Sequence, residues 1–141
     1  MRYVLAAILV LFVVTCSVAT KAEDLMPKVA YLSEEDMQEM LCPSGQCLEI
    51  VAFYDDASQT IVLREGFDPT KEYDLSILLH EFVHHLQKIN GHKRSDCVGD
   101  RERQAYQVQR TFLKERGHKD TNKVLGVDML TQMIITQCEY R

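Results

Sequence analysis

Hydrophobic and polar positions follow two different periods along this chain, and the change of period separates predicted strands from predicted helices. Residues 48–54 alternate in the pattern of a strand with an apolar middle, and residues 60–64 form a second short apolar run. Residues 55–59 are polar and small, as is typical of a tight turn. The pattern therefore predicts a β-hairpin over residues 48–64.

Helical spacing appears on both sides of this hairpin. Ser33-Glu34-Glu35-Asp36 resembles a capping box, with Leu32 and Met37 placed as a hydrophobic staple, and predicts a short helix to Met40 or Leu41. Two further helices are expected over residues 101–116, ended by Gly117, and over residues 122–136. The inner face of the last helix is expected to carry Leu125, Met129 and Met133, with Val127, Leu130 and Ile134 as further candidates.

The strongest helical pattern lies between the hairpin and residue 91. An apolar stripe at spacings of three and four consists of Leu78, Phe82, Leu86 and Ile89, widened by Leu75, Leu79 and Val83. Asp74 is the expected N-cap, with Ser76 as a second candidate, and Gly91 is the expected stop. We expect this helix to be buried on most sides and to lie at the centre of one small domain.

This central helix carries the motif His80-Glu81-Phe82-Val83-His84. Residues four apart lie on one face of a helix, so His80 and His84 can supply two ligands of a tetrahedral Zn²⁺ site. Glu81 is offset from that face and suits the role of general base toward a water molecule at the metal. His85 points about 100° away from His84 and is not expected to be a ligand, but to have a supporting or a surface role.

A third protein ligand is required to complete such a site. Glu102 is the favoured candidate, because it opens a returning helix on which Ala105 permits close approach to the first helix. Its rivals are His92 in the loop after Gly91, Asp100 at the start of the returning helix, and Asp96. A carboxylate at the position of Asp100 often caps a helix instead of binding a metal.

The combination of these residues resembles the zincin metallopeptidases, in particular the gluzincin arrangement of thermolysin-like enzymes. The chain is also similar to small secreted bacterial proteins that carry a Leu-His-Glu-x-x-His-x-x-Gln stretch, here Leu79 to Gln87, and a Cys-x4-Glu-x3-Tyr stretch, here Cys97 to Tyr106. The resemblance covers roughly residues 48–110. Tyr106 stands one turn after Glu102, where thermolysin-like enzymes have an acidic residue.

The resemblance implies a zinc-dependent peptidase with His80, His84 and Glu102 as metal ligands and Glu81 as general base. Tyr106 and His92 are candidate donors for the oxyanion of the transition state. The implied fold is α+β: a β-hairpin or small antiparallel sheet packed on the His80 helix, the Glu102 helix and a C-terminal helix. The substrate would be a peptide or protein. The order of elements allows a peptide to lie along a sheet edge through main-chain hydrogen bonds, and equally allows a hairpin that only covers the helices.

The N-terminus has the features of a signal peptide. Arg2 precedes an apolar run over residues 4–14, and small residues follow. Cleavage is expected after Ala22, with Ala19 as the alternative, which leaves residues 23–141 as one domain. This predicts a secreted or periplasmic protein, while an uncleaved N-terminal anchor is the competing interpretation. After cleavage no membrane-spanning segment is expected.

Composition narrows the functional classes further. The chain has a formal net charge of −5 and no basic cluster, which argues against a nucleic-acid partner. It contains no tryptophan, so an aromatic carbohydrate-binding platform has little support.

Cys42, Cys47, Cys97 and Cys138 lie outside the predicted signal peptide. Four cysteines in a secreted chain indicate disulfides, with three possible connectivities. The short turn between Cys42 and Cys47 favours a local bridge, which pairs Cys97 with Cys138. A cysteine-based zinc site is the alternative, but Cys-x2-Cys spacing is missing.

Two alternatives to a peptidase remain open at this point. The first is a non-catalytic binding or structural protein on a zincin-like scaffold. The small surface of the chain favours this interpretation, and the presence of Glu81 in the motif argues against it. The second is a metal-free protein stabilised by disulfides, in which the histidines are incidental.

Overall fold

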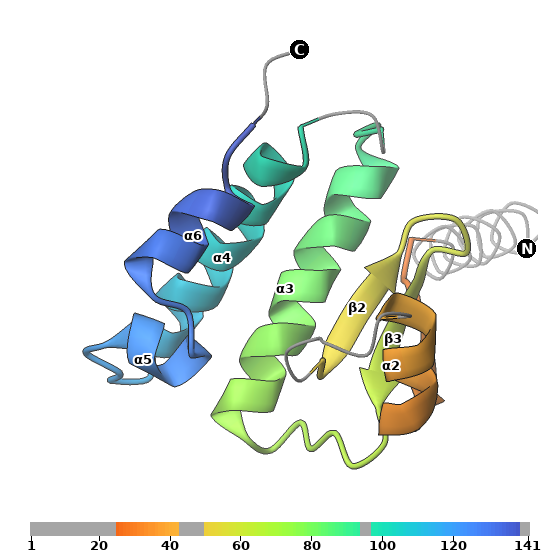
Figure 1. Ribbon diagram of the computed structural model, residues 1–141, viewed down its shortest axis with the longest axis horizontal. Coiled ribbons are helices and arrows are strands. Elements are labelled where there is room, and N and C mark those ends of the chain that lie inside the picture. The colour runs from red at the N-terminus through yellow and green to blue at the C-terminus, as the bar shows by residue number, and fades with distance from the viewer. Residues whose placement is uncertain (1–24, 43–49, 94–96, 139–141) are drawn as a thin grey trace, which may run out of the picture.

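The computed structural model describes residues 25–42, 50–93 and 97–138, and these residues form three strands and five helices (Figure 1). The predicted signal peptide (residues 1–22), Cys47 and Asp96 lie outside the described residues. In chain order the elements are β1 (Lys28–Leu32), α2 (Glu34–Leu41), β2 (Ala52–Asp55), β3 (Thr60–Arg64), α3 (Glu72–Ile89), α4 (Val98–Glu115), α5 (Thr121–Leu125) and α6 (Met129–Ile135).

The three strands form one mixed sheet with the order β1-β3-β2. β2 and β3 are the predicted hairpin and pair antiparallel, with Phe53 opposite Val62. β1 was not predicted, and it pairs parallel with β3, so the expected antiparallel sheet is wrong in this respect. β3 is the central strand, and all three of its middle residues, Ile61, Val62 and Leu63, are buried.

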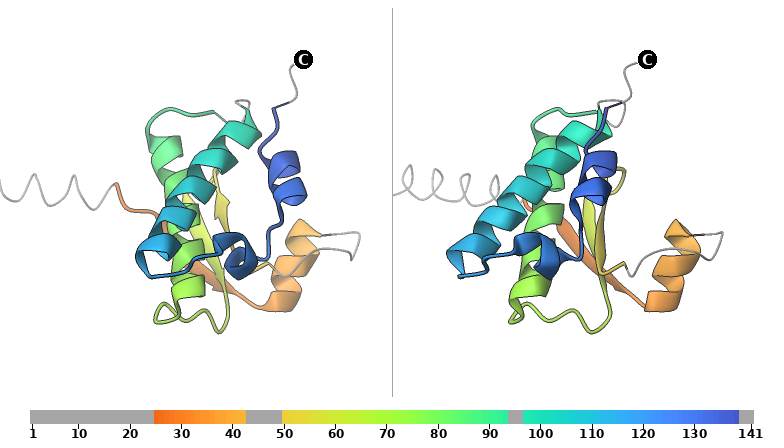
Figure 2. Two further views of the ribbon diagram at one scale, coloured as in Figure 1. Left: turned by 90° about the vertical axis from the view of Figure 1, so that its left-hand side faces the viewer. Right: turned by 60° about the vertical axis from the view of Figure 1, so that its left-hand side comes forward.

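α3 lies in the middle of the molecule, between the sheet and α4 (Figure 1). It contacts β2 and β3 on one side and runs along α4 on the other. α5 and α6 follow α4 and return beside it, as Figure 2 shows from two further directions, and residues of both helices border the same cavity as β2. None of the helices in the described ranges is long and apolar enough to cross a membrane.

Several local predictions are confirmed. Ser33 is the N-cap of α2 and accepts from the backbone N–H of Asp36, and Met37 in its first turn is buried. Gly91 and Gly117 follow the ends of α3 and α4 with φ of 91° and 92°, a conformation that glycine adopts without strain.

The predicted start of α3 is wrong. The helix begins at Glu72 with Lys71 as N-cap and has no side-chain cap. Asp74 instead accepts a hydrogen bond from the backbone N–H of Asp68 at 2.9 Å, which fastens the preceding loop. Ser76 lies inside the helix and donates to the carbonyl oxygen of Tyr73. α4 likewise begins earlier than predicted, with Cys97 as N-cap.

The most deeply buried face of α3 differs from the predicted apolar stripe. The side chains that α3 buries are polar: Ser76, His80, Glu81, His84, His85 and Gln87. Leu86 and Ile89 at the end of the stripe are exposed. The helix is packed between a sheet and a second helix, so its polar face is covered as well.

The predicted last helix is two helices. Gly126, with φ of 65°, ends α5, and Asp128 caps α6 by accepting from the backbone N–H of Thr131. Leu125 is buried as expected, but Met129, Leu130, Met133 and Ile134 are exposed, so their predicted place on an inner face is wrong. Because the chain is broken at Gly126, one helical period does not run through residues 122–136, and the predicted inner face does not form.

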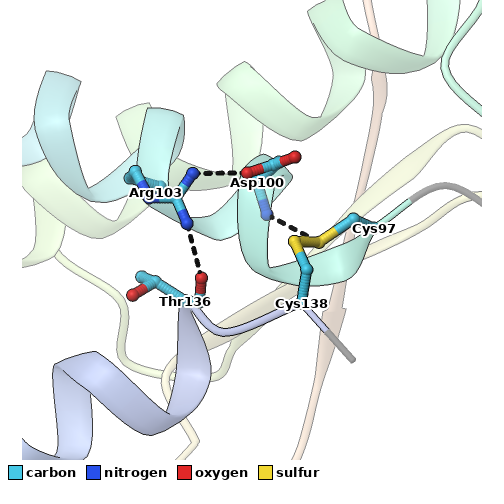
Figure 3. Close-up of a disulfide and its surroundings, with 5 residues drawn as sticks. All are labelled: Cys97, Asp100, Arg103, Thr136 and Cys138. Atoms are coloured by element: carbon cyan, nitrogen blue, oxygen red, sulfur yellow. Dashed lines mark hydrogen bonds and ion pairs between the residues drawn. A yellow bond between two sulfur atoms is a disulfide. The ribbon is translucent and has the colours of Figure 1, made fainter. Parts of the chain in front are cut away.

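A disulfide between Cys97 and Cys138 joins the start of α4 to the segment that follows α6 (Figure 3). The predicted pairing is confirmed, and the Cys97-based zinc alternative is thereby excluded. Arg103 donates to the carbonyl oxygen of Thr136 at 2.7 Å and pairs with Asp100. Cys42 is also disulfide-bonded, while its predicted partner Cys47 lies outside the described residues.

Gly99 allows the close approach at this junction. A Cβ at this position would lie 2.5 Å from the carbonyl oxygen of Gln137 and 2.6 Å from the backbone of Thr136. Both neighbours are backbone atoms next to the disulfide, so they have little freedom to move.

We therefore expect Gly99→Ala to lower the free energy of unfolding by roughly 1–3 kcal/mol, the typical cost of overpacking. The roughly 1 kcal/mol by which alanine favours a helix over glycine offsets only part of the upper range of this cost. Denaturant unfolding of the oxidised protein measures the change. Gln107→Ala, at an exposed position of the same helix, is the control and should be close to neutral. Equal stability of both variants would show that the junction is not tight.

Candidate metal centre

Three predicted metal ligands converge between α3 and α4. His80 and His84 project from α3, and Glu102 projects from the first half of α4. The two carboxylate oxygens of Glu102 each meet one ring: Oε2 lies 3.1 Å from Nε2 of His80, and Oε1 lies 3.2 Å from Nε2 of His84. The ligand atoms of all three residues lie within 4.8 Å of one another. Within the described ranges this is a geometrically suitable metal-binding group, as the sequence predicted.

The rival ligands lie elsewhere. Asp100 pairs with Arg103 at the surface, and His92 is exposed in the loop that follows α3. Asp100 also lies near Cys97 and Cys138, but a disulfide has no thiolate to offer a metal.

The electrostatics of the three side chains are coupled. Burial raises the pKa of Glu102, but hydrogen bonds and charge from His80 and His84 outweigh it and bring that pKa down to about 2. Burial lowers the pKa of His84, but its hydrogen bond to Glu102 outweighs this and raises the pKa above the usual value. The environment thus favours positive charge beside an ionised Glu102.

The other ring nitrogen of each histidine is held by a glutamine. Nδ1 of His80 lies 3.2 Å from Oε1 of Gln109, and Nδ1 of His84 lies 3.0 Å from Oε1 of Gln87. Both glutamines are buried. Such outer partners orient a histidine ring and select the nitrogen that faces a metal.

Glu81 is buried next to these ligands, at the junction of α3 with the sheet. Burial raises the pKa of its carboxyl group, His80 and His84 oppose the rise, and Glu102 adds to it. The backbone of Tyr54, on the edge strand β2, also lowers this pKa, by a smaller amount. Glu81 therefore lies between the candidate ligands and the strand that borders the site.

Two cavities meet at His80 and Glu81. One has a volume of about 450 Å³ and is bordered by Ala52 of β2 and by Tyr106, with largely apolar walls that include Leu125 and Ile135. The other, of about 350 Å³, is bordered by Phe53 and Tyr54 of β2 and by Glu102. Because β2 is an edge strand, the two cavities form a cleft that follows one edge of the sheet.

Tyr106 lies one turn after Glu102, as predicted, and its ring meets the ring of His80 edge-on with a centroid distance of 4.6 Å. Burial and the charge of Glu102 raise the pKa of its phenol, so the hydroxyl remains a hydrogen-bond donor at neutral pH. His92, the other predicted oxyanion donor, borders neither of the two cavities.

His85 has a structural role in the described part of the chain. Its side chain is almost fully buried, with Nδ1 3.1 Å from the hydroxyl of Tyr54 and Nε2 2.8 Å from the carbonyl oxygen of Leu25. It therefore fastens β2 and the segment before β1 to the back of α3. This agrees with the prediction that it is not a ligand, whereas the surface alternative is wrong.

A buried ion pair borders the same cleft. The guanidinium of Arg101 donates two hydrogen bonds of 3.1 Å to the carboxylate of Asp56, at the turn between β2 and β3. Its Nε also donates to Oε1 of Gln87 at 3.3 Å. Arg101 therefore connects the hairpin to the glutamine that holds His84.

The sequence matches the family described as "Domain of unknown function (DUF6647)" over residues 13–141. The chain belongs to the DUF6647 family. No curated protein and no solved structure matches it. All residues of the candidate metal centre of this DUF6647 protein lie inside the matched range.

Sequence reasoning did not find the outer residues Gln87, Gln109, Arg101 and Asp56. A signal existed for the first two, because Gln87 follows His84 by three positions and Gln109 follows Glu102 by seven, which are spacings of one helix face. Asp56 and Arg101 are 45 positions apart and meet only through the tertiary fold.

The Arg101–Asp56 pair generates a stability prediction for this DUF6647 protein. The two side chains are 10% and 20% exposed, so Asp56→Ala leaves a largely buried guanidinium without its carboxylate. We expect a loss of about 2–4 kcal/mol in the free energy of unfolding, near the range for breaking a buried pair.

Asp100→Ala is the matched control for this measurement. It removes the carboxylate of the exposed Arg103–Asp100 pair, whose two side chains are 56% and 58% exposed. Such a pair contributes at most about 1 kcal/mol. Equal losses in the two variants, measured by denaturant unfolding, would contradict the importance of the buried pair.

Proposed function

We propose that this protein is a zinc-dependent peptidase whose metal is held by His80, His84 and Glu102. The observation that carries the proposal is the placement of each histidine between two oxygens. Oε1 of a glutamine faces Nδ1, and a carboxylate oxygen of Glu102 faces Nε2. Both oxygens accept, so a neutral ring cannot satisfy them with its single proton.

A divalent cation resolves this conflict. With the proton of each ring on Nδ1, both Nε2 atoms offer lone pairs toward the carboxylate of Glu102, and the cation supplies the positive charge that all three groups require. Two imidazole nitrogens and one carboxylate are the protein ligands of a catalytic zinc site with an open fourth position. The donor set therefore fits Zn²⁺.

A bound Zn²⁺ would lower the pKa of a water molecule in its fourth position and polarise a carbonyl group. Glu81 would accept a proton from the attacking water and return it to the leaving amine. Tyr106, whose ring lies against His80, would donate a hydrogen bond to the developing oxyanion. A purely structural metal site would have no use for a buried glutamate beside its ligands.

The cleft supports a peptide as the substrate. It follows the edge strand β2, and a peptide chain can add to such an edge through main-chain hydrogen bonds. The cavities on either side of His80 and Glu81 would receive side chains from both sides of the bond that is cleaved. We propose further that the N-terminal segment directs the protein to a secreted or periplasmic location.

The ligand assignment is tested by metal content. The purified protein should contain close to one zinc per chain, and Glu102→Ala should weaken zinc binding by orders of magnitude, comparably to His84→Ala, because each removes one of three ligands. Asp100→Ala and His92→Ala should leave the affinity nearly unchanged. Full zinc occupancy in Glu102→Ala would contradict the assignment of Glu102 as the third ligand.

Glu81→Gln tests the reaction separately from the metal. The variant should keep its zinc, because Glu81 is not a ligand, and should lose hydrolysis by a factor of about 10²–10⁴, the usual contribution of a general base. Cleavage of a broad peptide library, followed by mass spectrometry, measures the rate. A wild-type protein that holds zinc and cleaves no peptide would favour a binding protein on the same scaffold.

Tyr106→Phe tests the proposed oxyanion donor. We expect the variant to retain zinc and to reduce kcat by about 10²–10³, the cost of removing one such donor, with little change in KM. A change confined to KM would assign Tyr106 to substrate binding.

A further inference from the structure

The amide groups of Gln87 and Gln109 could in principle face their histidines with either end. An amide offers an acceptor oxygen at one end and a donor nitrogen at the other, and its remaining partners decide between them. The choice matters, because it decides which nitrogen of each ring carries the proton and which one offers a lone pair to a metal.

The orientation of Gln109 is determined by Ser76. The hydroxyl of Ser76 has one proton, which it donates to the carbonyl oxygen of Tyr73 at 2.7 Å, and that oxygen can only accept. Ser76 must therefore accept from Nε2 of Gln109, 3.1 Å away. Oε1 of Gln109 is then the end that faces His80, so Nδ1 of His80 is the donor.

The orientation of Gln87 is determined by Arg101. Nε2 of Gln87 donates to the backbone carbonyl oxygen of Arg101 at 3.0 Å, which can only accept. Oε1 of Gln87 accepts from Nε of Arg101, which can only donate. Both ends of the amide are thus assigned, and Nδ1 of His84 must donate to Oε1.

Solvent offers these groups no alternative partners. Ser76 is fully buried, and Gln109 and Gln87 are 3% and 4% exposed. No buried side-chain nitrogen or oxygen in the described ranges lacks a hydrogen-bond partner, so turning either amide would break a satisfied network.

We infer that Gln87, Gln109 and Ser76 are positioning residues that hold both histidines with the proton on Nδ1 and Nε2 directed toward a metal. This inference rests on the metal site of the proposed function and assigns the residues that hydrogen-bond to its two histidine ligands. Without these residues the carboxylate of Glu102, which only accepts, would draw the ring proton to Nε2. A metal would then have to displace that proton from Nε2 before it could bind there.

Two substitutions at Gln109 separate polarity from packing. Gln109→Glu keeps an acceptor for Nδ1 of His80, and the hydroxyl of Ser76 can donate to its other carboxylate oxygen only by giving up the hydrogen bond to Tyr73. Gln109→Met has a similar size and no strong acceptor. We expect the zinc dissociation constant to rise about 10- to 100-fold in Gln109→Met and to stay unchanged or fall in Gln109→Glu.

If Gln109 had only a structural role, zinc binding would be weaker in Gln109→Glu than in Gln109→Met. A buried carboxylate costs more free energy than a buried thioether, so Gln109→Glu would then be the more damaged variant. Gln107→Glu and Gln107→Met, at an exposed position of α4, are the matched controls and should bind zinc like the wild type. Weaker zinc binding by Gln109→Glu than by Gln109→Met would overturn the inference.

A measurement on zinc-free protein decides the inference independently of the proposed function. At a pH at which both rings are neutral, ¹⁵N NMR of the imidazoles should show the proton on Nδ1 of His80 and His84. Ser76→Ala should move the proton of His80 toward Nε2 and leave His84 unchanged. A wild-type proton on Nε2 overturns the positioning role, whereas failure of the protein to bind zinc overturns the proposed function.

Discussion

The burial of the polar face of α3 against α4 is the constraint on which the rest of this structure depends. Histidine, glutamate, glutamine and serine side chains that are removed from water must each find a partner inside the protein, because an unpaired buried polar group costs several kcal/mol. The described residues meet this requirement completely. The helix pair is therefore held together by a polar network whose geometry is specific, in addition to apolar contact.

The same network gives the site its chemical character. The carboxylate of Glu102 is held ionised between two imidazole rings, and the far side of each ring is held by a glutamine. Glu81 borders the same cavity as Tyr54 of the edge strand, and Arg101 joins the hairpin turn to Gln87. The candidate ligands, the candidate base and the strand that borders the cleft are thus parts of one connected arrangement.

Local sequence signals predicted most of the elements but not their environment. The hairpin, the cap of α2 at Ser33 and the glycine ends of α3 and α4 depend on neighbouring residues, and these predictions are confirmed. The parallel strand β1, the break at Gly126 and the exposed face of α6 were missed or wrong. Hydrophobic periodicity indicates one buried face of a helix, and it fails for α3 because that helix is covered on two sides, one of them polar.

The sequence by itself indicated the two histidine ligands, since the spacing of His80 and His84 follows from local helix geometry, and it favoured Glu102 over Asp96, Asp100 and His92 without excluding them. The tertiary structure brought Glu102 to the two histidines. The sequence also predicted the Cys97–Cys138 pairing, from the number and spacing of the cysteines. Only the tertiary structure decided which groups surround those ligands: that Ser76 orients Gln109, that Asp56 meets Arg101, and that β2 borders the cleft. The physical reason is that hydrogen-bond partners and burial depend on which elements pack together, and that information is not contained in the spacing of residues along one helix.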